Sequence, residues 1–284
     1  MNALQYNACY KMDYNDTTLY FDYPNKRLKI LEHNEVPENV VQEIIAIAAK
    51  EGLGKIITYC RIRELSPFRA CGFVVEGMIN GFFKGENTYC LSYFIDKQRS
   101  ISLYKEEEDS ILSSCMNDIQ RFNYRPNKSY PVRKAKESDI PQMIAIFTET
   151  FKTYPSPVYN AEYLKNVMED QVLFMVAEDK GRIVSIASAE LDIRNSNAEI
   201  TDCATYPEYQ GKGLLTLLIH CLQSELSDRG FHTLYSLSRA IHPGINKALR
   251  KCGYKYGGRL IKNCHICGDF EDMNIWFKQL MKGG

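Results

Sequence analysis

The spacing of apolar residues in the second half of the chain predicts alternating helices and strands. Apolar residues three or four positions apart follow Ser138 and Asp139, which can cap a helix whose first turn contains Pro141. Short apolar runs bounded by Gly, Asn or Asp are typical of strands. The expected strands are 130–133, 172–177, 183–191, 198–204, 233–237, 254–261 and 271–277, and the expected helices are 140–147, 161–168, 214–229 and 244–251. This half should therefore be an α/β fold with a mixed sheet.

The first half repeats part of this order. A predicted helix at 40–50 precedes a strand, and Cys71-Gly72-Phe73 then leads into two further strands, as Cys252-Gly253-Tyr254 does in the second half. The shared order predicts an internal duplication, with a degenerate copy in residues 1–129 and a complete domain in residues 130–284. The alternative is that two α/β domains share these signals by chance.

Composition narrows the partners and the compartment. The 284 residues include 35 Lys+Arg and 35 Asp+Glu, and neither half has a basic excess, so we expect a small-molecule partner and neither nucleic acid nor membrane. The chain start lacks the pattern of a signal peptide, and clusters such as 214–219 are shorter than the roughly 20 residues that span a bilayer. Ten scattered cysteines are typical of reduced thiols, which favours a cytoplasmic protein.

One cysteine pair has the spacing of half a zinc site. Cys264 and Cys267 form a CxxC around His265, but the chain contains no second CxxC and no HxxxH. Zinc takes about four ligands, so we expect buried strand thiols and no metal.

A glycine-rich loop is the strongest chemical signal. Gln210-Gly211-Lys212-Gly213-Leu214 lies between a predicted strand and a predicted helix, where backbone N–H groups and the helix dipole can bind an anion. The segment contains neither the P-loop pattern nor GxGxxG. Taken alone, it is equally compatible with a glycine turn that only begins a helix.

With its surroundings, this loop resembles the signature of the GNAT acetyltransferase family. The signature (Gln/Arg)-x-x-Gly-x-(Gly/Ala) is met at Gln210 and Gly213, but Leu215 stands where the family prefers a small residue. The resemblance covers residues 130–277, including Cys252-Gly253-Tyr254. It implies a GNAT-like mixed sheet flanked by helices, N-acetyltransferase activity and acetyl-CoA as co-substrate.

The resemblance also implies how acetyl-CoA is bound. Loop amides would hold the pyrophosphate, and the preceding strand would pair with the pantetheine arm. The residues implied are Cys203, Ala204, Thr205, Gln210, Gly211, Lys212, Gly213, Leu214, Leu215 and Asn246. The first half has no counterpart of this loop, so we expect it to bind no CoA and to complete the acceptor cleft, with Tyr93 and Phe94 as contacts.

Acetyl transfer to an amine needs acid and base groups. An alkyl ammonium has a pKa of about 10.4 and must lose a proton before it attacks a thioester. Glu199 and Asp202 are the candidate bases; their spacing predicts opposite faces of a strand, and Asp202 is favoured because it is nearer the loop. Leu249 replaces the tyrosine that the family often uses as acid, which leaves Tyr254, Ser238 or solvent.

Longer strings resemble the β-lysine N-acetyltransferases, a group within this family. They are residues 81–85, 89–94, 238–240, 258–261 and 270–276. The resemblance implies acetylation of the ε-amine of β-lysine to Nε-acetyl-β-lysine, a compatible solute in osmoadaptation. A diamino acid needs a cation for its carboxylate and an acidic partner for its second amine. The candidates are Arg239 and Arg259 for the first, and Glu190, Asp192 and Glu271 for the second.

Two other functions fit the same residues. The enzyme could acetylate another small amine, such as a polyamine or an aminoglycoside. Because Leu249 replaces the usual tyrosine, the chain could also be an acetyl-CoA sensor without turnover. Release of free CoA in the presence of an amine distinguishes an enzyme from a sensor.

Overall fold

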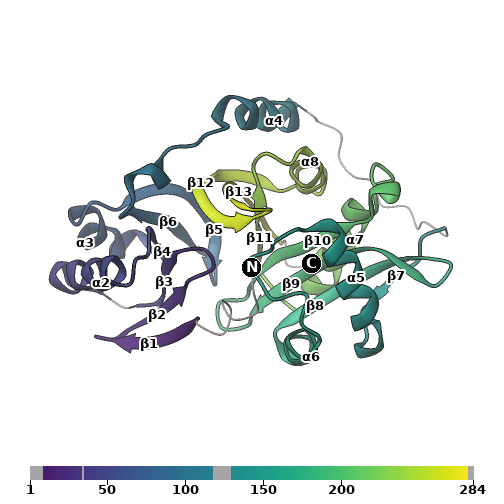
Figure 1. Cartoon of the computed structure of the whole chain (residues 1–284), viewed down its shortest axis with the longest axis horizontal. Helices are drawn as coiled ribbons and strands as arrows, with labels where there is room; N and C mark the ends of the chain where they lie inside the picture. The colour runs from purple at the N-terminus through teal and green to yellow at the C-terminus, as the bar shows by residue number, and fades with distance from the viewer. Residues whose placement is uncertain (1–8, 34, 118–128, 281–284) are drawn as a thin grey trace.

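Thirteen strands form one mixed sheet in the parts of the chain that the structure, a computed structural model, describes: residues 9–33, 35–117 and 129–280. The strand order is β1-β2-β3-β4-β6-β5-β12-β13-β11-β10-β9-β8-β7. Figure 1 shows α2 and α3 at one end of the molecule, α5, α6 and α7 at the other, and α4 beside α8.

The helices and strands predicted for the second half are confirmed, with small differences at their ends. The strands are β1 Tyr10–Tyr14, β2 Thr17–Asp22, β3 Arg27–Glu32, β4 Lys55–Cys60, β5 Val74–Phe83, β6 Glu86–Phe94, β7 Val132–Lys134, β8 Val172–Asp179, β9 Arg182–Asp192, β10 Asn197–Thr205, β11 Thr233–Arg239, β12 Lys255–Ile266 and β13 Asp269–Gln279. The helices are α2 Glu38–Lys50, α3 Leu65–Ala70, α4 Lys105–Asn117, α5 Ile140–Thr150, α6 Ala161–Asp170, α7 Leu214–Asp228 and α8 Pro243–Lys251. Short 3-10 turns lie at Ile62–Glu64, Lys97–Ser100, Glu137–Asp139 and Pro207–Tyr209.

The two halves of the sheet have similar strand orders when each is followed from its outer edge to the middle, except that the second half has one more outer strand. β3 and β4 are parallel neighbours joined through α2, as β10 and β11 are through α7. Each half then ends in an antiparallel hairpin, β5–β6 or β12–β13, at the centre of the sheet. An internal duplication would produce this order. The sheet nevertheless continues from β5 to β12, and the boundary at residue 129 remains a prediction.

Helices cover one face of each half of the sheet. Apolar residues of β2, β3 and β4 pack against α2 and α3, and those of β8 to β11 pack against α7 and α8. α5 and α6 cover part of the other face of β8, β9 and β10. A fourth cluster, with Ile79, Phe82, Tyr235, Ile275 and Phe277, draws on β5, β6, β11, β12 and β13 and so joins the two halves.

The halves meet where β5 and β12 approach each other through glycines. Gly77 of β5 lies opposite Gly258 of β12 in the antiparallel pairing of these two strands. A Cβ atom added at Gly257 would lie 2.3 Å from the carbonyl oxygen of Met78, and one added at Gly258 would lie 2.3 Å from that of Glu76. Side-chain carbons do not come so close to backbone atoms. Only glycine therefore permits this crossing.

Buried cations reinforce the crossing. Lys55 Nζ donates hydrogen bonds to Glu76 Oε2 at 2.8 Å and to the carbonyl oxygen of Ile261 at 2.7 Å. Arg27 Nη1 donates to the carbonyl oxygen of Asn263 at 2.8 Å. Arg99 binds carbonyl oxygens of both halves, including that of Lys262. Each charge is thus satisfied by groups on opposite sides of the junction.

We expect Gly257→Ala to lower the free energy of unfolding by about 1–3 kcal/mol, because the new methyl group overlaps the Met78 carbonyl oxygen. Gly244 is the control, since an added Cβ there would lie 3.6 Å from its nearest neighbour. Gly244→Ala, in a helix, should be neutral or stabilising by up to about 1 kcal/mol. Urea unfolding followed by circular dichroism measures both. Equal stabilities would contradict the crossing as the cause.

Candidate active site

The parallel strands β10 and β11 separate part way along their length. The last pair of residues in register between them is Glu199 and Tyr235. Asp202 then interrupts β10, with φ of 46° and a shift of register against β9 between Thr201 and Ala204. A bulge of this kind bends a strand. The facing edges of 200–205 and 236–239 therefore retain backbone groups that can pair with a ligand.

The loop after β10 presents uncapped backbone N–H groups. Gly211 and Gly213 both have φ of 76°, a left-handed conformation that favours glycine, and a Cβ at either would meet open space. Gly213 is the N-cap of α7, which has neither a side-chain cap nor an acidic residue in its first turn. The first amides of this 15-residue helix can therefore bind an anion such as a pyrophosphate.

Side chains around the loop hold it in place. Gln210 Nε2 donates to the carbonyl oxygen of Thr205 at 3.3 Å, and Lys212 Nζ lies 4.3 Å from the centre of the Tyr209 ring. Leu214 is buried, and Leu215 is half-buried against the apolar cluster under α7. The departure from the family signature at Leu215 thus leaves the helix well packed.

The end of β10 can contact a ligand mainly through its backbone. Ala204 is buried, and its carbonyl oxygen accepts a hydrogen bond from Ser185 Oγ at 3.3 Å. The Thr205 hydroxyl shares a 2.7 Å hydrogen bond with the same Ser185. Cys203 is half-buried and packs against the cluster under α7.

Glu199 and Asp202 lie on the same face of the sheet, so the prediction of opposite faces is wrong. Asp202 is the extra residue of the bulge, where simple alternation fails. Its Oδ2 accepts a 2.8 Å hydrogen bond from Ser188, which lies two residues before Glu190 on the same face of β9. Glu190 lies directly opposite Glu199 in the antiparallel pairing of β9 with β10. Three carboxylates therefore gather on this face.

Burial and mutual repulsion raise the pKa values of these carboxyl groups. Burial and then the charge of Glu190 raise the pKa of Glu199 to about 8, although Lys29 opposes the rise. Burial and then Glu190 raise the pKa of Asp202 to about 7. The Glu190 side chain is exposed to the open space beside this face, and the loss of solvent around its carboxyl group raises its pKa also. Carboxyl groups of this kind can exchange protons near neutral pH.

Two adjoining cavities lie against this face. Their volumes are about 1060 and about 310 Å³, and both are bordered by Arg27, Lys29, Glu190, Glu199 and Leu237. The two cations come from β3 in the first half, whereas the carboxylates come from β9 and β10. Asp202 borders neither cavity, so Glu199 is the more accessible of the two candidate bases.

Sequence analysis missed Arg27 and Lys29. The available signal was the alternation of charged and apolar residues in Arg27-Leu28-Lys29-Ile30. Leu28 and Ile30 are buried in the core of the first half, so the two cations must share the opposite face of the strand. Tyr93 and Phe94 border neither cavity, so the contacts predicted for them are wrong.

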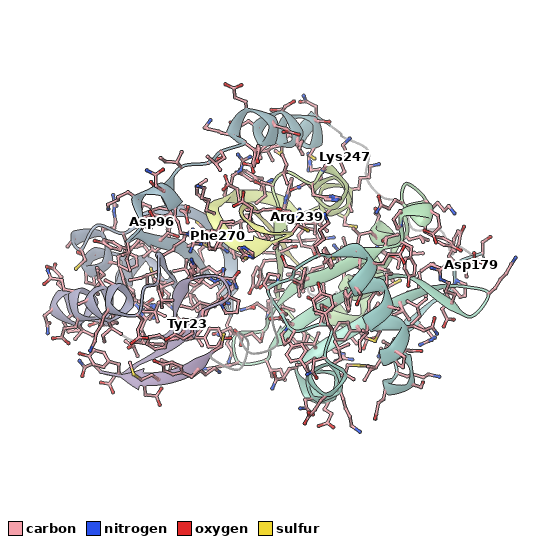
Figure 2. The ribbon with its side chains drawn as sticks, viewed as in Figure 1. Tyr23, Asp96, Asp179, Arg239, Lys247 and Phe270 are labelled. Carbon is pink, nitrogen blue, oxygen red and sulfur yellow. The ribbon has the colours of Figure 1, made fainter. Side chains whose placement is uncertain are left out.

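The arginines predicted to hold a substrate carboxylate are engaged within the protein. Arg239, labelled in Figure 2, forms a bidentate ion pair with Glu271, with both N–O distances at 2.6 Å. Arg259 is nearly buried and contacts Glu108 at 3.2 Å and Asp109 at 2.9 Å. Arg239, Arg259 and Glu271 border neither cavity. Of the predicted acidic partners, Glu190 borders both cavities and Asp192 borders the larger.

Asn246 does not fit the predicted cofactor contact, because both polar atoms of its side chain are hydrogen-bonded to other groups of the protein. It is fully buried. Its Oδ1 accepts hydrogen bonds from Ser238 at 2.9 Å, Asn274 at 3.0 Å and Trp276 at 2.8 Å. Its Nδ2 donates to two backbone carbonyl oxygens. Asn246 thus joins α8 to β11 and β13. Ser238, one of the candidate acids, donates its hydroxyl proton to Asn246 and is therefore engaged within the protein.

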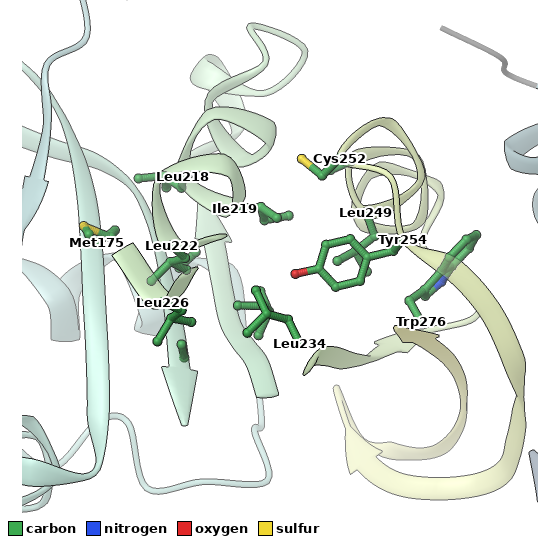
Figure 3. Packing of buried hydrophobic residues seen from close by; sticks show 14 of the residues in the cluster. Met175, Leu218, Ile219, Leu222, Leu226, Leu234, Leu249, Cys252, Tyr254 and Trp276 are labelled. Atoms are coloured by element: carbon green, nitrogen blue, oxygen red, sulfur yellow. The ribbon is translucent and has the colours of Figure 1, made fainter. Parts of the chain in front are cut away.

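Tyr254 places its hydroxyl group inside the core. Its side chain is fully buried in the same cluster as Leu249 and Trp276 (Figure 3). The side chain of Gln223 faces its hydroxyl group. Burial raises its pKa well above the usual range, so the hydroxyl stays protonated. Cys203 of β10 packs against the same cluster, and Tyr254 borders neither cavity.

Cys264 and Cys267 are free thiols in different surroundings. Cys264 is buried in β12, where its Sγ lies 3.4 Å from Arg27 Nη1. Cys267 is exposed in the turn after β12 with φ of 55°, so the expectation of buried strand thiols holds for Cys264 only. The described residues contain no group of three or more His, Cys, Asp or Glu arranged to hold a metal ion.

Comparison with known proteins agrees with this geometry. Residues 131–257 match the acetyltransferase (GNAT) domain family. A β-lysine N(6)-acetyltransferase of Methanosarcina mazei is 36% identical, over 86% of this chain and 97% of that protein. The N-acetyltransferase YodP of Bacillus subtilis is 34% identical, over 90% and 93% of the two chains. A β-lysine N(6)-acetyltransferase of Methanococcus maripaludis is 28% identical, over 94% and 97%.

Helices of the described segments are all too short or too polar to cross a membrane. The open glycine loop at the start of α7 and the unpaired edges of β10 and β11 fit acetyl-CoA. The chain belongs to the GNAT family of acetyltransferases and is an N-acetyltransferase with acetyl-CoA as its co-substrate.

Proposed function

We propose that the protein transfers the acetyl group of acetyl-CoA to the ε-amine of β-lysine. The observation that carries this proposal is the similarity, over most of the chain, to a β-lysine N(6)-acetyltransferase. The cavities support it, because carboxylates and cations border the same space, as the ammonium and carboxylate groups of an amino acid require. Osmoadaptation through the acetylated product is a further part of the prediction.

Each element of the site has a part in this reaction. The thioester of acetyl-CoA supplies the activated acetyl group. The amides of 211–215 hold the pyrophosphate, and the free edges of β10 and β11 align the pantetheine arm. Glu190 and Glu199 attract the substrate ammonium. Glu199 accepts its proton, and a pKa near 8 suits this role because proton transfer is efficient when the pKa of the base is close to the working pH.

Tyr254 is the proposed acid, although it borders neither cavity. Its protonated hydroxyl can donate a proton to the leaving sulfur, the role that the family tyrosine would have at position 249. Asp202 borders neither cavity and is the reserve candidate for the base. The cations on β3 disfavour polyamines, whose charges are all positive.

The acceptor prediction is that β-lysine is acetylated faster than α-lysine, polyamines or aminoglycosides. Cadaverine lacks the carboxylate and should lose about 10-fold or more in kcat/KM, as expected for a lost contact to a charged group. Thiol detection of free CoA measures the rate, and mass spectrometry of the product identifies the acetylated amine. Equal efficiency with cadaverine would contradict the proposal. Binding of acetyl-CoA without CoA release for any amine would favour a sensor.

The donor site is tested with Gly213→Val. Acetyl-CoA should bind about 10-fold more weakly or worse, a loss of about 1.4 kcal/mol, because the side chain blocks the approach of the pyrophosphate. Gly230→Val is the matched control, since Gly230 has φ of 80°, also borders open space, and lies at the other end of α7. Calorimetry should give one site per chain for the unmodified protein. Similar losses in both variants, or two equivalent sites, would count against this assignment.

The pH dependence tests Glu199. The group must be ionised to accept a proton, so kcat/KM should increase as the pH rises through about 8. Glu199→Gln should lower kcat about 10²-fold near neutral pH, with partial recovery at high pH where the free amine is abundant. Glu35→Gln, at the rim of the larger cavity, is the control and should keep the profile. An unchanged profile in Glu199→Gln would eliminate Glu199 as the base.

The same variant has a thermodynamic signature. Because the pKa of Glu199 is raised from 4.5 to about 8, the folded protein holds more protons than the unfolded chain between these values. The contribution of this group to stability is therefore largest below pH 4.5 and is lost as the pH rises toward 8. Glu199→Gln should be at least as stable as the parent at pH 8. A loss of activity then reports on chemistry and not on folding.

A further inference from the structure

The first half contributes several cations to the cavity wall, and most of them already have close partners. Arg27 is buried, and its Nε contacts Asp22 Oδ2 at 2.7 Å. Arg61 contacts Glu86 at 2.6 Å, and Arg63 contacts the same carboxylate at 3.4 Å. These ion pairs occupy the guanidinium groups, so a substrate carboxylate would have to compete with an acid of the protein.

Lys29 differs from these arginines. Its nearest carboxylate oxygen in an ion pair is that of Asp22, at 3.9 Å, beyond hydrogen-bond distance. Its side chain is 31% exposed, and it borders both cavities. Its neighbours Leu28 and Ile30 are fixed in the core of the first half, so β3 holds Lys29 on the cavity side. The ammonium therefore retains capacity for another acceptor.

The position of Lys29 complements that of the carboxylates. Glu190 and Glu199 border the same two cavities from β9 and β10. Burial and then Arg27 lower the pKa of Lys29, whereas Asp22 and Glu190 oppose this change. A carboxylate bound at hydrogen-bond distance would be a closer negative partner for Lys29 than Asp22 is. A diamino acid can thus span the site, with its reacting amine at Glu199 and its carboxylate toward β3.

We propose that Lys29, from the half of the chain without the acetyl-CoA loop, binds the carboxylate of the acceptor and so selects amino acids over simple amines. This inference rests on the proposed function. A competing role for Lys29 is to favour the ionised form of Glu199, which it would do for any acceptor. The two roles differ in their dependence on the substrate carboxylate.

The test compares Lys29→Met and Lys29→Arg with two acceptors, β-lysine and its decarboxylated analogue 1,4-diaminopentane. For Lys29→Met, the KM of β-lysine should rise by about 10-fold to 100-fold, the range for a lost hydrogen bond to a charged group, with a smaller change in kcat. The KM of the diamine should not rise. Lys29→Arg should recover much of the loss, and Lys50→Met, an exposed lysine of the same half away from both cavities, should behave like the parent.

Each other outcome has a definite meaning. Equal losses for both acceptors, with a shifted pH profile, would overturn carboxylate binding and assign Lys29 to Glu199. Unchanged kinetics in Lys29→Met would overturn any role in selection. If the parent protein uses the two acceptors equally well, the proposed function fails together with this inference. If the parent prefers β-lysine and Lys29→Met does not alter that preference, the inference alone fails.

Discussion

The close approach of β5 and β12 determines where the acceptor cavity can form. Gly77, Gly257 and Gly258 let the two backbones meet at a distance that any side chain would prevent. The joint is reinforced by an apolar cluster from both halves and by Lys55, which binds a carboxylate on one side and a carbonyl on the other. Because the joint fixes one half against the other, β3 and β10 can border the same cavity although they are far apart in the sheet order.

The three carboxyl groups on one face of β9 and β10 favour proton transfer at a cost to the stability of the fold. Glu190, Glu199 and Asp202 all have raised pKa values, so their ionised forms are unfavourable in the folded protein. The surrounding core compensates for this cost, since large apolar clusters lie on both sides of β9 and β10. A cationic acceptor relieves the repulsion when it binds. The same charges that destabilise the empty site therefore contribute to affinity for an amine.

Much of the fold could be predicted from the sequence, because periodicity and turn residues are local properties. The glycine loop was also predictable, since Gly211 and Gly213 are needed where φ is positive and a helix begins. Three assignments depended on long-range contacts and failed for that reason: Asn246 is saturated by residues of β11 and β13, Arg239 pairs with Glu271, and Arg259 pairs with α4. The bulge at Asp202 could not be predicted, because an aspartate in a strand-like sequence does not by itself indicate a left-handed backbone conformation.

The division of labour between the two halves has an evolutionary consequence. The glycine loop lies at the start of α7, whereas the cationic wall of the cavity lies on β3, at the far side of the glycine joint. Substitutions on β2 to β4 can change the shape and charge presented to an acceptor without altering any backbone group that meets the donor. If the two halves arose by the duplication that the sequence predicts, one copy would have been retained for the coenzyme while the other diversified, so that related proteins could keep the same acetyl donor and differ in the amines they modify.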